Sequence, residues 1–247
     1  GMQTHGPGSS IYMGWGAQLH DSSDHKIDTK KLSKSRYSRD LTCGDRHCAA
    51  NGNSLAPWQL REFPEVSSNQ YLHIPYLTDR ELIQDSSNNH WQGIYQGAYS
   101  SLSLKYSSQD TYIKHLELGY GSELILTAGT YWVESLVLAS NSQIRSAGDG
   151  PVWIVTKQNT FLGYKSKITP NNSASPIGLV SQSSIYLSSE ASVRGLVYAQ
   201  RRIDLEWNAL IKGGVLANKV NLSSDATIIY SPDSFQGLDL SHVLPIL

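Results

Sequence analysis

The sequence predicts an all-β fold: a right-handed parallel β-helix, or β-solenoid, with an irregular N-terminal excursion. Three observations lead to this prediction. A nine-residue pattern recurs along the chain, its apolar positions alternate as they do in strands, and its corner holds residues that tolerate sharp turns. The pattern is apolar-x-apolar-x-x-x-small-x-apolar, and residues 203–211 (IDLEWNALI) give its clearest copy.

The copies return at intervals of about 20 residues. They are residues 11–19 (IYMGWGAQL), 116–124 (LELGYGSEL), 136–144 (LVLASNSQI), 160–168 (TFLGYKSKI), 185–193 (IYLSSEASV) and 220–228 (VNLSSDATI). From residue 116 onward the starts are 20, 24, 25, 18 and 17 residues apart. Such self-similarity is typical of a solenoid, in which each coil stacks on the last. A left-handed coil prefers strict hexapeptides, whereas variable steps favour the right-handed form.

Within one copy, the apolar residues follow the two-residue period of a strand. Ile203 and Leu205 point inward while Asp204 points outward, and Ala209 and Ile211 repeat the alternation after a corner. Position seven is small, which suits a chain that bends close to the axis. Position six is occupied by residues that accept a left-handed backbone cheaply: Asn208, Asp225, Asn141, Gly16 and Gly121. The spacing does not match a helical stripe, and an antiparallel β-sandwich is the main rival fold.

Four regions follow from the distribution of the copies. Residues 1–19 form an N-terminal strand or first coil, and residues 20–100 form an irregular, partly helical excursion that packs against the solenoid or caps it. If residues 11–19 are a coil, this excursion is an insertion between stacked coils. In this excursion, the capping box from Thr78 to Glu81 predicts a short helix ending near Asp85. Residues 101–231 form the solenoid, and residues 232–247 form a tail that caps the last coil with Phe235, Leu238 and Leu240.

The composition restricts the class of protein. The chain has 247 residues, of which 39% are hydrophobic, so it can bury a substantial core. With 20 Lys and Arg against 21 Asp and Glu, it lacks the basic surface that nucleic-acid binding requires. No apolar segment is long enough for a membrane span. No cofactor motif is present.

Two cysteines lie in the segment LTCGDRHCAANGN. Cys43 and Cys48 are spaced to close a small loop as a disulfide, which implies an oxidising compartment. A metal site of Cys43, His47 and Cys48 is the alternative, but it lacks a distant second pair of ligands. The Gly-Met start indicates an artificial beginning from which a leader has been removed.

Outward positions of the coils carry the candidate catalytic residues. Polysaccharide lyases and hydrolases built on solenoids need carboxylates, or a carboxylate with Arg or Lys, on outward positions of adjacent coils. Asp204, Glu206 and Arg194 are the candidates, although the flanking copies hold Tyr186 and Asn221 beside Asp204 rather than a second acid. An ion-paired, solvated face is therefore the preferred interpretation of this cluster.

Position five carries the candidate binding residues, namely Trp15, Tyr120, Tyr164 and Trp207. Exposed rings at these positions would form a strip for stacking on sugar rings, because aromatic faces pack well on the apolar faces of pyranoses. The alternative is purely structural stacking along the corner. A metal site within residues 20–25 (HDSSDH) is a further hypothesis, and loop composition alone produces such clusters.

The chain also resembles a known family at residues 126–144, 195–230 and 3–19, and at the CGDRHC pair. It is similar there to bacterial surface proteins of the MshQ type, which are encoded with the mannose-sensitive haemagglutinin pilus, a type IV pilus. A looser resemblance is to the polymer-forming β-helical bactofilin scaffolds. The sequence departs from these patterns at Thr160 in position one and at the aromatic residues in position five, where small polar residues are expected.

What the resemblance implies is an extracytoplasmic, non-enzymatic scaffold or adhesin connected with pilus biogenesis or surface attachment. The expected partners are pilus or surface components or glycans, and open coil ends would allow self-association. The alternative function is a polysaccharide-binding or polysaccharide-degrading β-helix.

Overall fold

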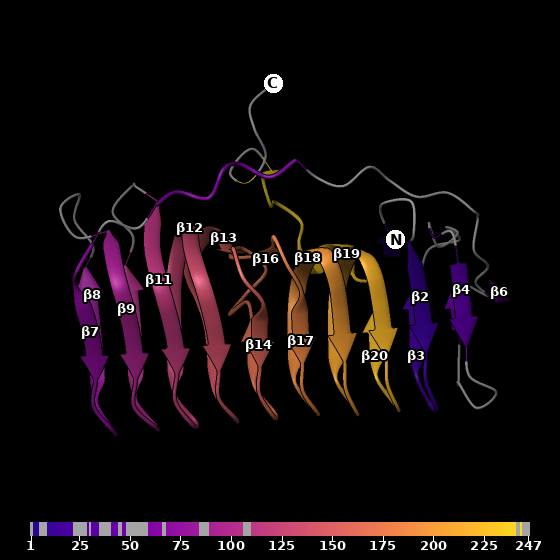
Figure 1. Cartoon of the computed structure of the whole chain (residues 1–247), viewed down its shortest axis with the longest axis horizontal. Helices are drawn as coiled ribbons and strands as arrows, with labels where there is room; N and C mark the ends of the chain where they lie inside the picture. The colour runs from indigo at the N-terminus through magenta and orange to yellow at the C-terminus, as the bar shows by residue number, and fades with distance from the viewer. Residues whose placement is uncertain are drawn as a thin grey trace.

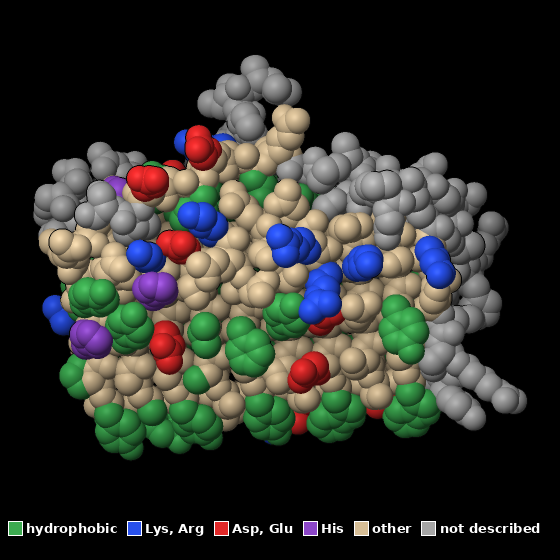
Figure 2. Space-filling model, viewed as in Figure 1, with side chains coloured by type: hydrophobic (Ala, Val, Ile, Leu, Met, Phe, Trp, Pro, Cys, Tyr) green, Lys and Arg blue, Asp and Glu red, His purple; other side chains and the backbone are tan. Residues whose placement is uncertain are grey.

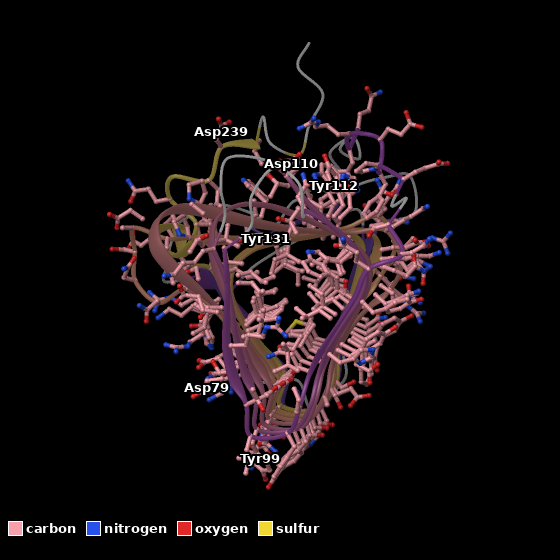
Figure 3. All side chains as sticks on the ribbon, turned by 90° about the vertical axis from the view of Figure 1, so that its left-hand side faces the viewer. Asp79, Tyr99, Asp110, Tyr112, Tyr131 and Asp239 are labelled. Carbon is pink, nitrogen blue, oxygen red and sulfur yellow. The ribbon has the colours of Figure 1, made fainter. Side chains whose placement is uncertain are left out.

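Strands that lie one above another in parallel register make up most of the described chain, so the computed structural model confirms the right-handed β-solenoid (Figure 1). The structure describes residues 2–4, 9–21, 29, 31–34, 41–43, 46–47, 59–65, 68–83, 89–105, 110–240 and 243. Each coil contributes to three sheets, which enclose a triangular cross-section (Figure 3). We call them the front, back and top sheets, from their places in Figure 1.

The front sheet is a continuous ladder whose strands run toward the lower edge in Figure 1. It contains β7 (Tyr71–Ile74), β9 (His90–Gln96), β11 (Thr111–Leu118), the end of β12 (Glu123–Leu138), β14 (Thr160–Leu162), β17 (Ile185–Leu187), the ends of β18 (Ser192–Leu205) and β19 (Leu210–Leu222), β2 (Ser10–Met13) and β4 (Lys31–Lys34). Leu187 pairs with Leu205, and Leu205 pairs with Leu222, so the predicted inward aliphatic column is confirmed.

The back sheet begins after the corner at which each front strand ends. It contains β8 (Asp79–Ile83), β10 (Ser101–Lys105), the start of β12, the start of β13 (Gln143–Thr156), β15 (Lys167–Thr169), the starts of β18 and β19, β20 (Thr227–Ile229), β3 (Gln18–Asp21) and β5 (Leu41–Cys43). The two-residue strand β6 (Arg46–His47) pairs antiparallel with β5.

The top sheet closes the triangle and is apolar on both of its sides. It contains the start of β11, the middle of β12, the end of β13, β16 (Ile177–Ser181), the middle parts of β18 and β19, and β1 (Met2–Thr4). Its outward side chains form a second buried cluster: Trp132, Trp153, Val155, Val180, Tyr198 and Leu216. Burial of each large side chain contributes about 1.5–3 kcal/mol, so this face needs a cover.

Two segments far apart in the sequence provide that cover. Residues 59–65 run along the top of the stack in Figure 1, where Phe63 meets Trp132 edge to face with ring centroids 5.6 Å apart. The C-terminal segment with the short 3-10 helix η1 (Pro232–Ser234) adds Leu238 and Leu240. Leu238 and Leu240 of the predicted tail therefore pack on the outside of the top sheet, and not on the end of the last coil as predicted.

The N-terminal residues extend the C-terminal end of the stack. β1 and β2 pair with β19, β3 pairs with β20, and β4 and β5 add to β2 and β3. Residues 11–19 are thus a coil, as predicted. However, this coil stacks on residues 220–228, at the opposite end of the described stack from the coil that begins at residue 71.

The solenoid also starts earlier than predicted. β7 and β8 form a coil from residue 71 onward, and β9 and β10 form the next one. The helix expected from Thr78 to Asp85 is absent, because residues 79–83 form β8 and pair with β10. Main-chain pairing to a neighbouring coil has overridden the local capping signal. Among the described residues, no helix is long and apolar enough to cross a membrane.

The same tight turn recurs at the corner between the front and back sheets in the coils whose turns end at Ala17, Ser100, Ser122, Ser142, Ser166, Ala191, Ala209 and Ala226. The N–H of position seven donates to the carbonyl of position four, for example from Ala209 to Glu206 at 3.0 Å. Position six has a positive φ, as a type II turn requires. Within the described chain, every non-glycine residue with a positive φ lies here: Leu77, Tyr99, Asn141, Lys165, Glu190, Asn208 and Asp225. Gly16 and Gly121 complete the set, so the predicted left-handed corner is confirmed.

Candidate functional site

The candidate site is the corner itself, where position five faces solvent on each coil whose corner the structure describes. Hydrogen bonds define the order of the coils: the N–H of position six donates to the carbonyl of position five on the next coil, as from Glu190 to Trp207 at 2.9 Å. The order along the corner is Tyr76, Ala98, Tyr120, Ser140, Tyr164, Ser189, Trp207, Ser224 and Trp15. Aromatic and small residues therefore alternate without exception along the described corner.

We call the five aromatic members, Tyr76, Tyr120, Tyr164, Trp207 and Trp15, the aromatic ridge. Their exposed fractions lie between 40% and 61%. In Figure 2 the corner forms the lower edge of the molecule, and hydrophobic side chains follow it from end to end. Eight inter-coil steps of about 4.8 Å give the ridge a length of roughly 38 Å.

The structure brings together all four aromatic residues predicted at position five. It also adds Tyr76, which sequence reasoning missed because its coil holds Leu77 at position six and Arg80 at position nine. The only signal for that coil was the alternation of Leu72 and Ile74 before the turn. Trp15 joins the ridge through the hydrogen bond from the Asp225 N–H to its carbonyl, at 2.8 Å.

The ridge is held differently along its length. At the end near β7, Tyr99 from position six meets Tyr76 and Tyr120 edge to face, with centroids 6.0 and 5.3 Å away. In Figure 3, Tyr99 marks the lower vertex of the triangle. Burial, with a further contribution from the hydrogen bond to Tyr120, raises the pKa of Tyr99. These three rings form a continuous aromatic cluster.

Tyr164 in the middle of the ridge is fixed by two charged neighbours. Its hydroxyl donates to Glu190 at 2.9 Å, and the Lys165 ammonium lies 4.9 Å from its ring centroid. Lys165 also pairs with Glu190 at 3.4 Å. The hydrogen bond with Tyr164 and the charge of Glu190 raise the pKa of Lys165. The ring is therefore oriented before any ligand arrives.

A shallow polar hollow of about 390 Å³ flanks Tyr164 on the back-sheet side. It is lined by Asn141, Gln143, Lys165, Lys167 and Glu190. These side chains come from positions six and eight of three successive coils. They supply amide, ammonium and carboxylate groups beside an exposed ring, a combination suited to the hydroxyl groups of a sugar.

The candidate catalytic residues do not form one cluster. Asp204 on the front sheet pairs with Arg202 at 2.8 Å and accepts a hydrogen bond from Asn221 at 2.6 Å. Glu206 accepts a hydrogen bond from Ser188 at 2.9 Å. Arg194 lies on the back sheet, opposite Lys212. The structure thus places the two carboxylates on one side of the corner and Arg194 on the other, and the ion pair in this group joins Asp204 to Arg202.

The predicted cysteine and histidine sites fall largely outside the described residues. Cys48, Asp24 and His25 are not described, so the disulfide with Cys43 and the two metal hypotheses stay predictions. Within the described part of the chain, no group of three His, Cys, Asp or Glu side chains is arranged to hold a metal ion.

A second exposed aromatic group lies on the front sheet and was not predicted. His73 stacks on Tyr95 of the next coil, with centroids 5.1 Å apart and planes 12° from parallel. Tyr71 lies in the same stack, 6.4 Å from Tyr95. This group shows that the fold can place rings on successive coils. The spacing between coils therefore does not by itself require the alternation along the ridge.

Comparison with known proteins adds no family to this geometry. No protein-family model matches the chain, and neither the curated proteins nor the solved structures contain a match. The candidate site is therefore interpreted from its own chemistry.

Proposed function

We propose that this chain is a non-enzymatic, extracytoplasmic β-solenoid of a bacterial surface, acting as a scaffold or adhesin, whose aromatic ridge attaches to extended polysaccharide. The observation that supports the binding role is the exposure of five aromatic side chains in one line. The resemblance to surface proteins of a type IV pilus system supports the surface location.

The turn does not need aromatic residues at position five. Ser140, Ser189 and Ser224 occupy the same position on alternate coils, with the same hydrogen bonds across the corner. A Trp or Tyr there exposes apolar surface without contributing to the core, and several such side chains along one edge are typical of a binding surface. Structural stacking accounts for Tyr76, Tyr99 and Tyr120, but no ring contact joins Trp207 to Tyr164.

The ridge is also rigid, which favours affinity. Hydrogen bonds link each described coil to the next at the corner, with lengths between 2.8 and 3.2 Å. A binding surface that is already ordered loses little conformational entropy when the ligand arrives. A long polymer can then contact several rings at once, so that weak individual contacts add up to useful avidity.

Affinity electrophoresis in gels containing soluble polysaccharides tests the proposal. We expect the wild-type protein to be retarded, and we expect Trp207→Ser and Tyr164→Ser each to weaken binding about tenfold. This estimate assumes that a sugar covers roughly 60 Å² of each ring at about 25 cal/mol per Å². Serine is the natural residue of the neighbouring coils, so the substitution preserves the turn.

Phe161→Ser is the matched control. Phe161 is 46% exposed, but it lies on the front sheet and outside the ridge. We expect this variant to bind like the wild type. Equal losses in Phe161→Ser and Trp207→Ser would point to general surface stickiness and contradict the proposal. Catalysis is the alternative, and glycan turnover that Asp204→Asn abolishes would establish it instead.

A further inference from the structure

The most informative feature of the ridge is its period. At position five, aromatic residues occupy every second coil from Tyr76 to Trp15, with Ala98, Ser140, Ser189 and Ser224 between them. Beside Ala98 the ring of Tyr99 at position six contacts both neighbouring rings, so the open gaps lie at the three serines. Since neighbouring strands lie about 4.8 Å apart, the aromatic platforms recur about every 9.6 Å. A ligand that uses several platforms must therefore present matching surfaces at that interval.

Packing does not impose this alternation. His73 and Tyr95 lie on successive coils of the front sheet and stack at 5.1 Å, and Phe161 and Tyr186 also occupy paired positions on successive coils. At position five itself, both aromatic and small residues fit the turn. The serines between Tyr120, Tyr164, Trp207 and Trp15 are therefore best explained by a ligand that lies on the ridge and needs space there.

We propose that the ligand is a ribbon-like polysaccharide with a two-residue repeat, of the class formed by β-1,4-linked pyranoses. This inference rests on the proposed function and specifies its ligand. In such a ribbon each sugar is turned by half a revolution relative to the last, so every second sugar presents the same apolar face. One sugar extends the ribbon by about one inter-coil step of this solenoid.

The gaps between platforms fit the same geometry. A sugar stacked on Tyr164 and another stacked on Trp207 leave one inverted sugar between them, above Ser189. A serine there leaves the inverted ring uncrowded and offers a hydroxyl that donates or accepts a hydrogen bond. The amides and ammonium groups of the hollow beside Tyr164 would contact the hydroxyl groups along the edge of the ribbon.

Polymers with another shape do not match the ridge. An α-1,4-linked glucan coils into an open helix, and a β-1,3-linked glucan also curves away from a straight line. Neither polymer holds successive sugar faces in one plane at a constant interval along the roughly 38 Å of the ridge, estimated from the inter-strand spacing. We therefore expect selectivity by linkage rather than by sugar identity alone.

A variant that shifts one platform out of phase tests the inference. Trp207→Ser combined with Ser189→Trp keeps the number and type of exposed rings, but it moves one ring to the coil next to Tyr164. Affinity electrophoresis would use hydroxyethylcellulose as the β-1,4-glucan, soluble starch as the α-1,4-glucan and laminarin as the β-1,3-glucan. Far-ultraviolet circular dichroism checks that the fold is retained.

The expected result is retardation of the wild type by hydroxyethylcellulose alone, and a loss of at least tenfold in the shifted variant, equal to that of Trp207→Ser. If the shifted variant does not fold, Tyr164→Ser combined with Ser140→Tyr makes the same exchange elsewhere on the ridge. Retention by all three polymers, or full binding by the shifted variant, would overturn the inference and leave the proposed function intact. A wild type that binds none of the three polymers and no other polysaccharide would overturn both.

Discussion

Replacing Ile11 by alanine tests whether the N-terminal coil completes the C-terminal end of the solenoid. Ile11 is fully buried and lies in the front-sheet column between Val220 and Leu32. Truncating a buried isoleucine costs about 2–5 kcal/mol, because the apolar contacts are lost and a cavity remains. For a chain of this size, 1 kcal/mol corresponds to about 2–4 °C in Tm. We expect Ile11→Ala to lower Tm by roughly 4–20 °C.

The loss of stability in Ile11→Ala should be confined to one end of the molecule. In a solenoid each coil contacts only its neighbours, so stability is close to a sum of local terms. Hydrogen exchange followed by mass spectrometry should therefore show faster exchange in residues 10–21 and 210–229, and unchanged exchange in residues 90–138. Tyr12→Ser is the matched control, because Tyr12 is 49% exposed. An Ile11→Ala variant as stable as this control would refute the non-sequential stacking.

Three further substitutions test the corner, the close approach of coils and the effect of burial. Leu77 has a φ of 55°, and this left-handed conformation costs a non-glycine residue about 1–2 kcal/mol. Glycine removes that cost but loses more backbone entropy on folding, so Leu77→Gly should raise the free energy of unfolding, measured in urea, by up to about 1 kcal/mol. A Cβ at Gly213, where φ is 153°, would meet the carbonyl oxygen of Gly195 on the adjacent coil, so Gly213→Ala should lower Tm sharply. Burial, with Asp110 adding to it, raises the pKa of Tyr112, so the folded state favours the neutral phenol. The contribution of Tyr112 to the free energy of unfolding should be fully present below about pH 10 and should be lost as the pH rises above that value. Unfolding curves should show a smaller loss in Tyr112→Phe, and spectrophotometric titration should show the raised pKa directly.

The fold class could be predicted because each coil carries its own local signals. Alternating apolar residues specify the strands, and glycine, asparagine or aspartate at position six specifies the turn. The order of the coils could not be predicted in the same way. Residues 11–19 carry the same pattern whether they stack on residues 116–124 or on residues 220–228, so periodicity does not identify the neighbour.

The candidate site was predictable to the same extent. Aromatic residues at position five marked Trp15, Tyr120, Tyr164 and Trp207, but their alternation depends on knowing every coil and its neighbours. Tyr76 was missed because Leu77 adopts a positive φ in the folded chain, and leucine does not indicate such a turn in the sequence. The hollow beside Tyr164 combines residues from three coils, and no local pattern brings such residues together.

Tryptophan fluorescence during titration with a soluble β-1,4-linked oligosaccharide tests the central claim most directly. Trp207 and Trp15 are 47% and 51% exposed, whereas Trp132 and Trp153 are buried, so a ligand on the ridge should change the emission of Trp207 and Trp15 and leave that of Trp132 and Trp153 unchanged. We expect a saturable blue shift in the wild type that is at least halved in Trp207→Ser and absent from the double variant with Trp15→Ser. An unchanged wild-type spectrum, or a shift that survives in the double variant, would contradict the assignment of the ridge as the binding surface.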